Sequence, residues 1–236
     1  MRLEPLSRTL DQLDAADLIL IGASKAFDVG SAAPPAPFRY AGPLISIPEW
    51  VAPNTVASTS DERPLVLVSF STTFQNQVAV VRRCVAALAE LPVRGIVTLG
   101  PAMRVDDVAG AANVEVTQSA SHDALMPLCA LMICHGGHGT MLRPLMHGVP
   151  VICLPMGRDQ PDNAARIVAR GAGLTLSSRS GPRAIRRAVQ TVLAEPTYAA
   201  AAADLGARIR AEVDGGLAAA EAIEALANRV AASADA

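Results

Sequence analysis

Short apolar runs alternate with helical stretches through the middle of the chain, and this alternation limits the possible folds more than any other feature. We expect strands at "LVLVSF" (65–70), "GIVTLG" (95–100), "NVEV" (113–116), "LMIC" (131–134), "VICLP" (151–155) and "LTLS" (174–177). Helical stretches lie between them, at 75–91, 122–129, 139–148 and 158–171. Strands that alternate with helices predict an α/β fold with a doubly wound, parallel, Rossmann-like sheet.

Both ends of the chain depart from this alternation. Near the start, "ADLILIG" (16–22) predicts a buried strand, and the Pro- and Ala-rich segment 31–55 has no helical or alternating period. We expect that segment to be a linker or an extended crossing segment. After the sheet, three helices are expected, at 182–194, 198–213 and 217–230.

Composition argues against several classes of protein. The chain has 236 residues with 20 basic and 22 acidic side chains, a balance that does not favour a nucleic-acid binder. Its four cysteines form no CxxC pair, which predicts reduced, buried thiols in the cytoplasm. No apolar run approaches the roughly 18 residues that a membrane span needs. The amphipathic N-terminus does not resemble a secretory signal, so we expect a soluble, cytoplasmic protein.

Four loops that follow predicted strands are unusual, and they should share one crevice because ligands bind at the carboxyl ends of parallel strands. They are "STT" (71–73), "TQSASH" (117–122), "HGGHGT" (135–140) and "MGRDQ" (156–160). In the third loop, Gly136, Gly137 and Gly139 remove side chains where a strand turns into a helix. The exposed N–H groups and the helix dipole there predict an anion site. A tight turn that needs positive φ is the alternative explanation for these glycines.

Two other functions of the glycine loop are not favoured. A metal site would use Cys134, His135 and His138, but the side chains of neighbouring strand residues point to opposite faces, so no metal is expected. A dinucleotide oxidoreductase would need GxGxxG and an acidic residue about 20 positions later, and this pattern is absent.

A long motif gives a more specific indication. Residues 135–176, "HGGHGTMLRPLMHGVPVICLPMGRDQPDNAARIVARGAGLTL", resemble the donor-binding signature of the family 1 nucleotide-sugar-dependent glycosyltransferases. This family includes plant and animal UDP-glycosyltransferases and bacterial enzymes that glycosylate macrolides and other natural products. Similarity extends to "RYAGPL" (39–44), "LVLVSFSTT" (65–73) and "ALAELPVRGIVTLG" (87–100), and in all from about residue 16 to the end.

The resemblance implies the GT-B fold, in which an acceptor-binding N-terminal domain faces a C-terminal domain that binds the sugar nucleotide. We therefore expect residues 1–40 to be a remnant of the end of the acceptor domain and 41–63 to be an interdomain linker. Residues 64–214 should form the Rossmann-like donor domain, and 215–236 a C-terminal helix and tail.

The resemblance also implies roles for single residues, with a UDP- or dTDP-sugar as donor substrate and with no cofactor or metal. The donor diphosphate would contact Ser71, Thr72, His135, Gly136, Gly137, Gly139 and Thr140. Asp159 and Gln160 would bind hydroxyls of the donor sugar, and Ala120 and His122 would lie beside the uracil or thymine ring. The helix dipole would then stabilise the charge that develops on the diphosphate.

Simpler roles compete with some of these. Asp159 could cap the helix that follows it, and His122 could be an exposed residue at a helix start. His138 is expected to pack or to cap, and His147 to end its helix next to Gly148.

The chain also departs from the family pattern. Arg143 stands where the plant signature has a glutamate that binds the ribose hydroxyls, and a guanidinium cannot accept those hydrogen bonds. Ser119 and Ser121 replace a proline and an aromatic residue of the base-binding loop. The family's general base is a histidine early in the acceptor domain, whereas all four histidines here lie between 122 and 147. We expect no catalytic residue in this chain.

The expected function is metal-independent, inverting transfer of a hexose from a UDP- or dTDP-sugar to a hydroxyl of a small-molecule acceptor. We expect a truncated form that binds only donor, its acceptor site belonging to a complete N-terminal domain or a partner chain. The alternative is a non-catalytic donor-binding subunit of a two-chain enzyme, and a sugar-nucleotide epimerase is less favoured. In either of the first two cases "ADLILIG" would have lost its sheet partners and would expose apolar surface.

Overall fold

The computed structural model describes residues 13, 15–30, 33–45, 61–70, 72–73, 75–212 and 214–234. The chain divides into two compact units. One comprises Met1–Leu44 together with Ala211–Ala236, and the other comprises Ile45–Arg210. The expected division at 1–40, 41–63, 64–214 and 215–236 stays a prediction, and most of the expected linker lies outside the described residues.

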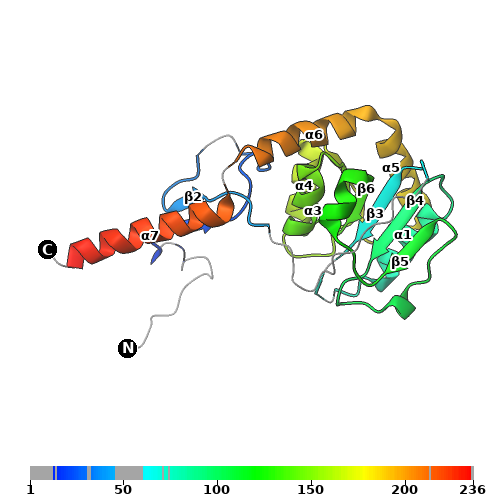
Figure 1. The fold of residues 1–236 in the computed structure, drawn as a ribbon, viewed down its shortest axis with the longest axis horizontal. Helices are drawn as coiled ribbons and strands as arrows, with labels where there is room; N and C mark the ends of the chain where they lie inside the picture. The colour runs from blue at the N-terminus through cyan, green and yellow to red at the C-terminus, as the bar shows by residue number, and fades with distance from the viewer. Residues whose placement is uncertain are drawn as a thin grey trace. The chain divides into compact units, whose positions relative to one another are not determined.

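The larger unit contains a six-stranded sheet in which every neighbouring pair is parallel (Figure 1). Its strands are β3 (Leu65–Ser69), β4 (Arg94–Thr98), β5 (Val114–Thr117), β6 (Cys129–Cys134), β7 (Val151–Cys153) and β8 (Gly173–Thr175). Their order is β5-β4-β3-β6-β7-β8, so the predicted doubly wound parallel sheet is confirmed.

Helices follow the strands as the alternation predicts. They are α1 (Val78–Leu88), α2 (His122–Leu125), α3 (His138–Met146), α4 (Gln160–Ala169), α5 (Pro182–Ala194) and α6 (Pro196–Arg210), with the 3₁₀ turns η2 (Val105–Asp107) and η3 (Met126–Leu128). One expected helix, 122–129, is wrong in its second half. Pro127 lacks an N–H, the chain tightens into η3, and Cys129 already begins β6.

Two helical layers cover the sheet because alternate strand residues point to opposite faces. Val66 and Val68 of β3 belong to the core that includes buried residues of α1 and α5, and these two helices pack together. On the other layer, α3 packs against α6 and contacts β6 and β7 (Figure 1). All five residues of β3 are buried, as expected for a central strand that is covered on both faces.

The sheet has a topological switch point between β3 and β6. β3 pairs with β4 on one side and with β6 on the other, and the chain reaches β6 only after completing β4 and β5. The connections that leave β3 and β6 therefore run in opposite directions, which opens a crevice at their carboxyl ends. The glycine loop lies at this point because it directly follows β6.

The smaller unit contains the strands β1 (Ile19–Ile21) and β2 (Phe38–Tyr40) and the helix α7 (Gly215–Ala234). β1 falls inside the expected strand 16–22. Within segment 31–55, interpreted as a linker or an extended crossing segment, Phe38–Tyr40 forms a strand that pairs in parallel with β1. β1 therefore has a sheet partner, contrary to expectation, and its residues are half-buried. Three residues are too few for a period to be detected in the sequence.

Glu212 and Gly215 hold the smaller unit together at two points. The Glu212 carboxylate accepts hydrogen bonds from Ser24 Oγ and the Ala26 N–H, both at 2.8 Å. Gly215 lies against the chain near β2, where a Cβ would lie 2.6 Å from the Gly42 carbonyl oxygen. Only glycine leaves room for this approach.

The four cysteines are free, and three are buried: Cys84, Cys134 and Cys153. Burial raises the pKa of the Cys84 thiol to about 12, which keeps it protonated and unreactive. Within the described ranges, no helix combines the length and the apolar character that crossing a bilayer requires.

Candidate functional site

The glycine loop is short and sterically constrained. His135, Gly136 and Gly137 connect β6 to α3, and Gly136 has φ of +89°. A Cβ on Gly136 would lie 3.1 Å from the Gln160 carbonyl oxygen, and a Cβ on Gly137 would overlap Nε2 of His135. A Cβ on Gly139 would meet nothing within 4 Å. The tight-turn explanation therefore holds for Gly136, while Gly139 leaves open space over the first turn of α3.

The amides of this loop differ in what they can bind. The Gly136 N–H donates to Cys134 Sγ at 3.3 Å, so its part in an anion site is to shape the turn. The first helical bond of α3 runs from the Met141 N–H to the Gly137 carbonyl, at 3.0 Å. The N–H groups of Gly139 and Thr140 come before that bond. They lie in the first turn, where a helix supplies no carbonyl acceptor for its own N–H groups. Gly137 is the N-cap and has no side chain that could satisfy them.

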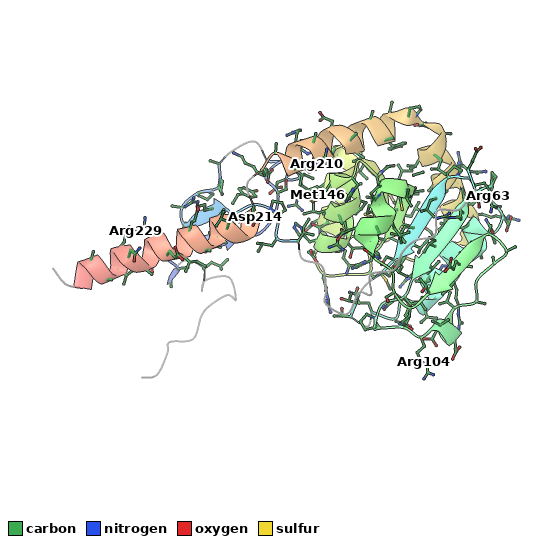
Figure 2. The ribbon with its side chains drawn as sticks, in the orientation of Figure 1. Arg63, Arg104, Met146, Arg210, Asp214 and Arg229 are labelled. Atoms are coloured by element: carbon green, nitrogen blue, oxygen red, sulfur yellow. The ribbon has the colours of Figure 1, made fainter. Side chains whose placement is uncertain are left out.

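The far end of α3 is held in place. Arg210 at the end of α6 donates a hydrogen bond to the Met146 carbonyl, and Figure 2 shows the two residues side by side. A cation at a helix C-terminus also interacts favourably with the helix dipole. His147 is the C-cap of α3, as the sequence predicted. These contacts fix the axis of the helix whose N-terminus faces the crevice.

His135 lies beneath the glycines and is buried, with 6 % of its surface exposed. Its ring stacks on Phe70 of the β3 end, with the ring centres 6.2 Å apart. Among the residues that the structure describes, its Nδ1 has no hydrogen-bond partner. Burial lowers the pKa of His135 to about 4; Asp159 opposes this shift and Arg158 adds to it. His135 is therefore neutral at pH 7, with one buried nitrogen unsatisfied.

Asn163 of α4 connects the glycine loop to Asp159. Its buried Nδ2 donates to the Gly136 carbonyl at 3.0 Å and to Asp159 Oδ2 at 2.8 Å. Asp159 occupies the N-cap position of α4, but its side chain makes no capping hydrogen bond. The capping alternative is therefore right about the position of Asp159 and wrong about the role of its carboxylate, which is exposed and held by Asn163.

The Gln160 amide binds other parts of the protein at both ends. Its Oε1 accepts from the Met156 N–H at 2.7 Å, and its Nε2 donates to Gln75 Oε1 at 2.9 Å. Gln160 is 2 % exposed. It therefore joins the loop after β7 to the loop after β3, and in this conformation its amide does not point to solvent.

Arg158 also spans these two loops, and no pattern in the sequence marks it. Its Nη1 donates to Thr73 Oγ1 at 3.4 Å. Thr72, next to Thr73, is exposed, and Ser71 lies outside the described residues.

A second cluster lies at the ends of β4 and β5. His122 begins α2, and its Nε2 lies 3.0 Å from Thr98 Oγ1 in a hydrogen bond. Burial, followed by the positive charge of Arg143, lowers the pKa of His122 to about 4, and Asp123 opposes the shift. His122 is thus not the exposed helix-start residue of the simpler alternative. Ala120 is half-buried in the preceding loop.

Arg143 of α3 forms an ion pair with Asp123 of α2, with Nε 3.0 Å from Oδ1. The Arg143 side chain is 15 % exposed and the Asp123 side chain 37 %. Arg143, which stands where the plant signature has a glutamate, therefore holds the partly exposed Asp123 carboxylate next to α3. Throughout the described ranges, no group of three or more His, Cys, Asp or Glu side chains is arranged to hold a metal ion.

Residues 82–224, more than half of the chain, match the family model described as "Erythromycin biosynthesis protein CIII-like, C-terminal domain". The chain belongs to this EryCIII-like family. The predicted resemblance to the C-terminal part of bacterial natural-product glycosyltransferases is thereby confirmed.

Two relatives are similar to most of the EryCIII-like chain. It is 32 % identical over 192 residues to 4'-demethylrebeccamycin synthase of Lentzea aerocolonigenes, covering 80 % of this chain and 45 % of the relative. It is 30 % identical over 194 residues to TDP-daunosamine transferase DnrS of Streptomyces peucetius, covering 78 % and 43 %. The EryCIII-like chain thus spans less than half the length of these relatives.

A solved structure shares the fold. Spinosyn rhamnosyltransferase SpnG complexed with thymidine diphosphate superposes with a TM-score of 0.70 at 26 % identity. The match covers 88 % of the EryCIII-like chain and 56 % of SpnG. The expected fold, that of the C-terminal half of a GT-B glycosyltransferase, is confirmed by this match and by the parallel sheet.

Proposed function

We propose that this chain is the donor-binding part of a glycosyltransferase that transfers a hexose from a UDP- or dTDP-sugar to a hydroxyl of a small-molecule acceptor. The observation that carries the proposal is the glycine loop at the switch point between β3 and β6, above a buried histidine with an unsatisfied nitrogen. Such a loop at a helix N-terminus suits a diphosphate.

The diphosphate would lie on the first turn of α3, against the amides of Gly139 and Thr140, with Gly136 and Gly137 shaping the approach. Thr72, and Ser71 outside the described residues, would also contact it. As the bond from the sugar to the phosphate breaks, negative charge develops on the diphosphate, and preorganised N–H groups stabilise it. A neutral His135 would contribute by donating a ring N–H.

The sugar hydroxyls would bind the exposed Asp159 carboxylate. The hydrogen bond from Asn163 supports this role because it fixes the position of the carboxylate and leaves further lone pairs free to accept. Gln160 belongs to the proposed sugar site as well. To reach a hydroxyl, its amide must exchange the bond to Gln75 or the bond from Met156.

The nucleobase would lie beside Ala120 and His122, and the ribose beside Asp123. The ion pair with Arg143 supports this second role, since it holds a carboxylate that can accept ribose hydroxyls. Uracil and thymine both suit the proposal. DnrS is named as a TDP-daunosamine transferase, and SpnG has been solved in complex with thymidine diphosphate.

Transfer also needs an acceptor site and a general base, which we place outside the described residues, on a complete acceptor domain or on a partner chain. The described part would then bind donor but not transfer it alone. The reaction would be inverting and metal-independent, and it would take place in the cytoplasm.

Calorimetric titration with UDP, dTDP and NAD tests the proposal. We expect UDP or dTDP to bind, NAD not to bind, and His135→Ala and Asp159→Ala to weaken binding of the matching UDP- or dTDP-sugar. Equal affinities in the wild type and in both variants would refute the assigned site. Transfer to a phenolic or macrolide acceptor by this chain alone would refute its need for an acceptor domain.

A further inference from the structure

The backbone at Gly157 and Arg158 makes a sharp turn between β7 and α4. Gly157 has φ of +141° and Arg158 has φ of +58°. The left-handed conformation is unfavourable for a residue with a side chain, and glycine or asparagine would adopt it more readily. Arg158 is exposed, so core packing does not explain an arginine at this strained position.

The Arg158 guanidinium has little to bind within the protein. Its hydrogen bond to Thr73 Oγ1 is long, at 3.4 Å, and Thr73 carries no charge. A guanidinium has five N–H donors, and Arg158 takes part in none of the ion pairs between described residues. The bond to Thr73 directs the side chain toward the loop after β3 and leaves donors for another acceptor.

Contacts of α4 place this cation near the glycine loop, because Asn163 donates both to the Gly136 carbonyl and to Asp159, the residue after Arg158. The positive charge of Arg158 also helps to lower the pKa of the His135 ring. The same ring touches Gly137 and has an unsatisfied Nδ1. Open space over Gly139 lies in the first turn of α3, directly after this loop. Several donors therefore surround one small region of the described structure, and an anion bound there would satisfy them.

We propose that Arg158 is the cation that binds the donor diphosphate on the glycine loop. The inference rests on the proposed function. A planar guanidinium can bind two phosphate oxygens at once, and it adds a full positive charge where the helix N-terminus supplies only a partial one. When the bond between the anomeric carbon and the phosphate oxygen breaks, its electron pair stays on the diphosphate. Arg158 stabilises that charge from the loop between β7 and α4.

The assignment predicts which part of the ligand Arg158 recognises. Removing its charge should weaken binding of the diphosphate and leave binding of the nucleoside unchanged. The monophosphate should lie between the two. A residue that only supports the loop would instead affect all three ligands alike, because the loop would be displaced for each.

Titration calorimetry with uridine, UMP and UDP, and with the matching thymidine series, tests this. The variants are Arg158→Gln and Arg158→Lys, with Arg187→Gln as control, since Arg187 is an exposed arginine in the middle of α5. We expect Arg158→Gln to lose about tenfold in affinity for the diphosphate and nothing for the nucleoside. Arg158→Lys should recover part of the loss, and Arg187→Gln should match the wild type.

Salt gives a second readout. Diphosphate affinity of the wild type should fall more steeply with ionic strength than that of Arg158→Gln, since one charge pair has been removed. An Arg158→Gln variant that binds diphosphate as well as the wild type, or that weakens nucleoside and diphosphate equally, would overturn the role of Arg158 alone. A wild type that binds neither diphosphate would overturn the proposed function and this inference together.

Discussion

The side-chain amide of Asn163 donates to the main-chain carbonyl of Gly136 at 3.0 Å, from a helix that begins at Gln160, 24 residues after Gly136. The same nitrogen donates to Asp159, 2.8 Å away. One buried amide thus sets the distance between the proposed diphosphate site and the proposed sugar site, and the two loops cannot move independently while it is in place.

Replacing Asn163 tests that coupling. Asn163→Ala leaves the Gly136 carbonyl buried without its donor, so the free energy of unfolding should fall by about 1 to 3 kcal/mol. Affinity for a nucleotide sugar should fall more than affinity for the nucleoside diphosphate, because the Asp159 carboxylate is released. Denaturant unfolding and calorimetry measure the two effects. Asp162→Ala, an exposed change on the same helix, is the control; an equal effect there would count against a specific role of Asn163.

The glycines of the loop should differ sharply in their response to alanine. Gly137→Ala must displace the His135 ring, so we expect both stability and diphosphate binding to be lost. Gly139→Ala meets no neighbour and gains helix propensity of up to about 1 kcal/mol, so stability should hold or rise. Its methyl group would enter the space proposed for the diphosphate, and binding should weaken. Unimpaired binding in a stable Gly139→Ala variant would mean that this space is not the anion site.

The two histidines with lowered pKa values should make stability depend on pH. The pKa values of His135 and His122 are lowered from 6.5 to about 4, so between these values the unfolded chain binds more protons than the folded chain. The free energy of unfolding should therefore decrease as the pH falls from 6.5 toward 4, by at most about 1.4 kcal/mol per pH unit for each histidine. His135→Gln should flatten the profile and exposed His147→Gln should not. A profile level from pH 7 to 5 would contradict neutral, buried rings.

The ion pair of Arg143 and Asp123 makes a prediction about His122. Because Arg143 lowers the pKa of His122 and Asp123 raises it, Arg143→Gln should raise that pKa and Asp123→Asn should lower it. Titration of the ring protons by NMR measures both shifts. If Asp123 also accepts ribose hydroxyls, Asp123→Asn should lose more affinity for UDP than for 2′-deoxy-UDP. Equal losses for the two nucleotides would remove Asp123 from the ribose site.

The sequence predicts most of the sheet because its strands are apolar runs and the intervening helices have clear ends. It also predicts the place of the glycine loop. The strands and this loop are both determined by residues that are neighbours in the sequence. β2 was missed because Phe38–Tyr40 is too short to show a period and depends on β1 for its hydrogen bonds. Arg158, Asn163 and Asp123 were missed for a related reason. Each acts through a contact with another segment, and no local pattern marks such a contact.

Gln160 shows a further limit of reasoning from a motif. The motif implies that its amide binds sugar hydroxyls, whereas in the structure the amide binds Met156 and Gln75. A motif records residue identity, and the conformation of a side chain depends on what surrounds it. We predict that Gln160 exchanges one of these partners when donor binds.

The central claim is that a nucleoside diphosphate binds on the first turn of α3. An assigned amide NMR spectrum of the isotopically labelled chain, recorded during addition of UDP and of dTDP, tests it most directly. We predict saturable shifts at Gly139 and Thr140, with smaller ones at Gly136 and Gly137. Shifts confined to other parts of the chain, or no shifts with either nucleotide, would contradict the claim.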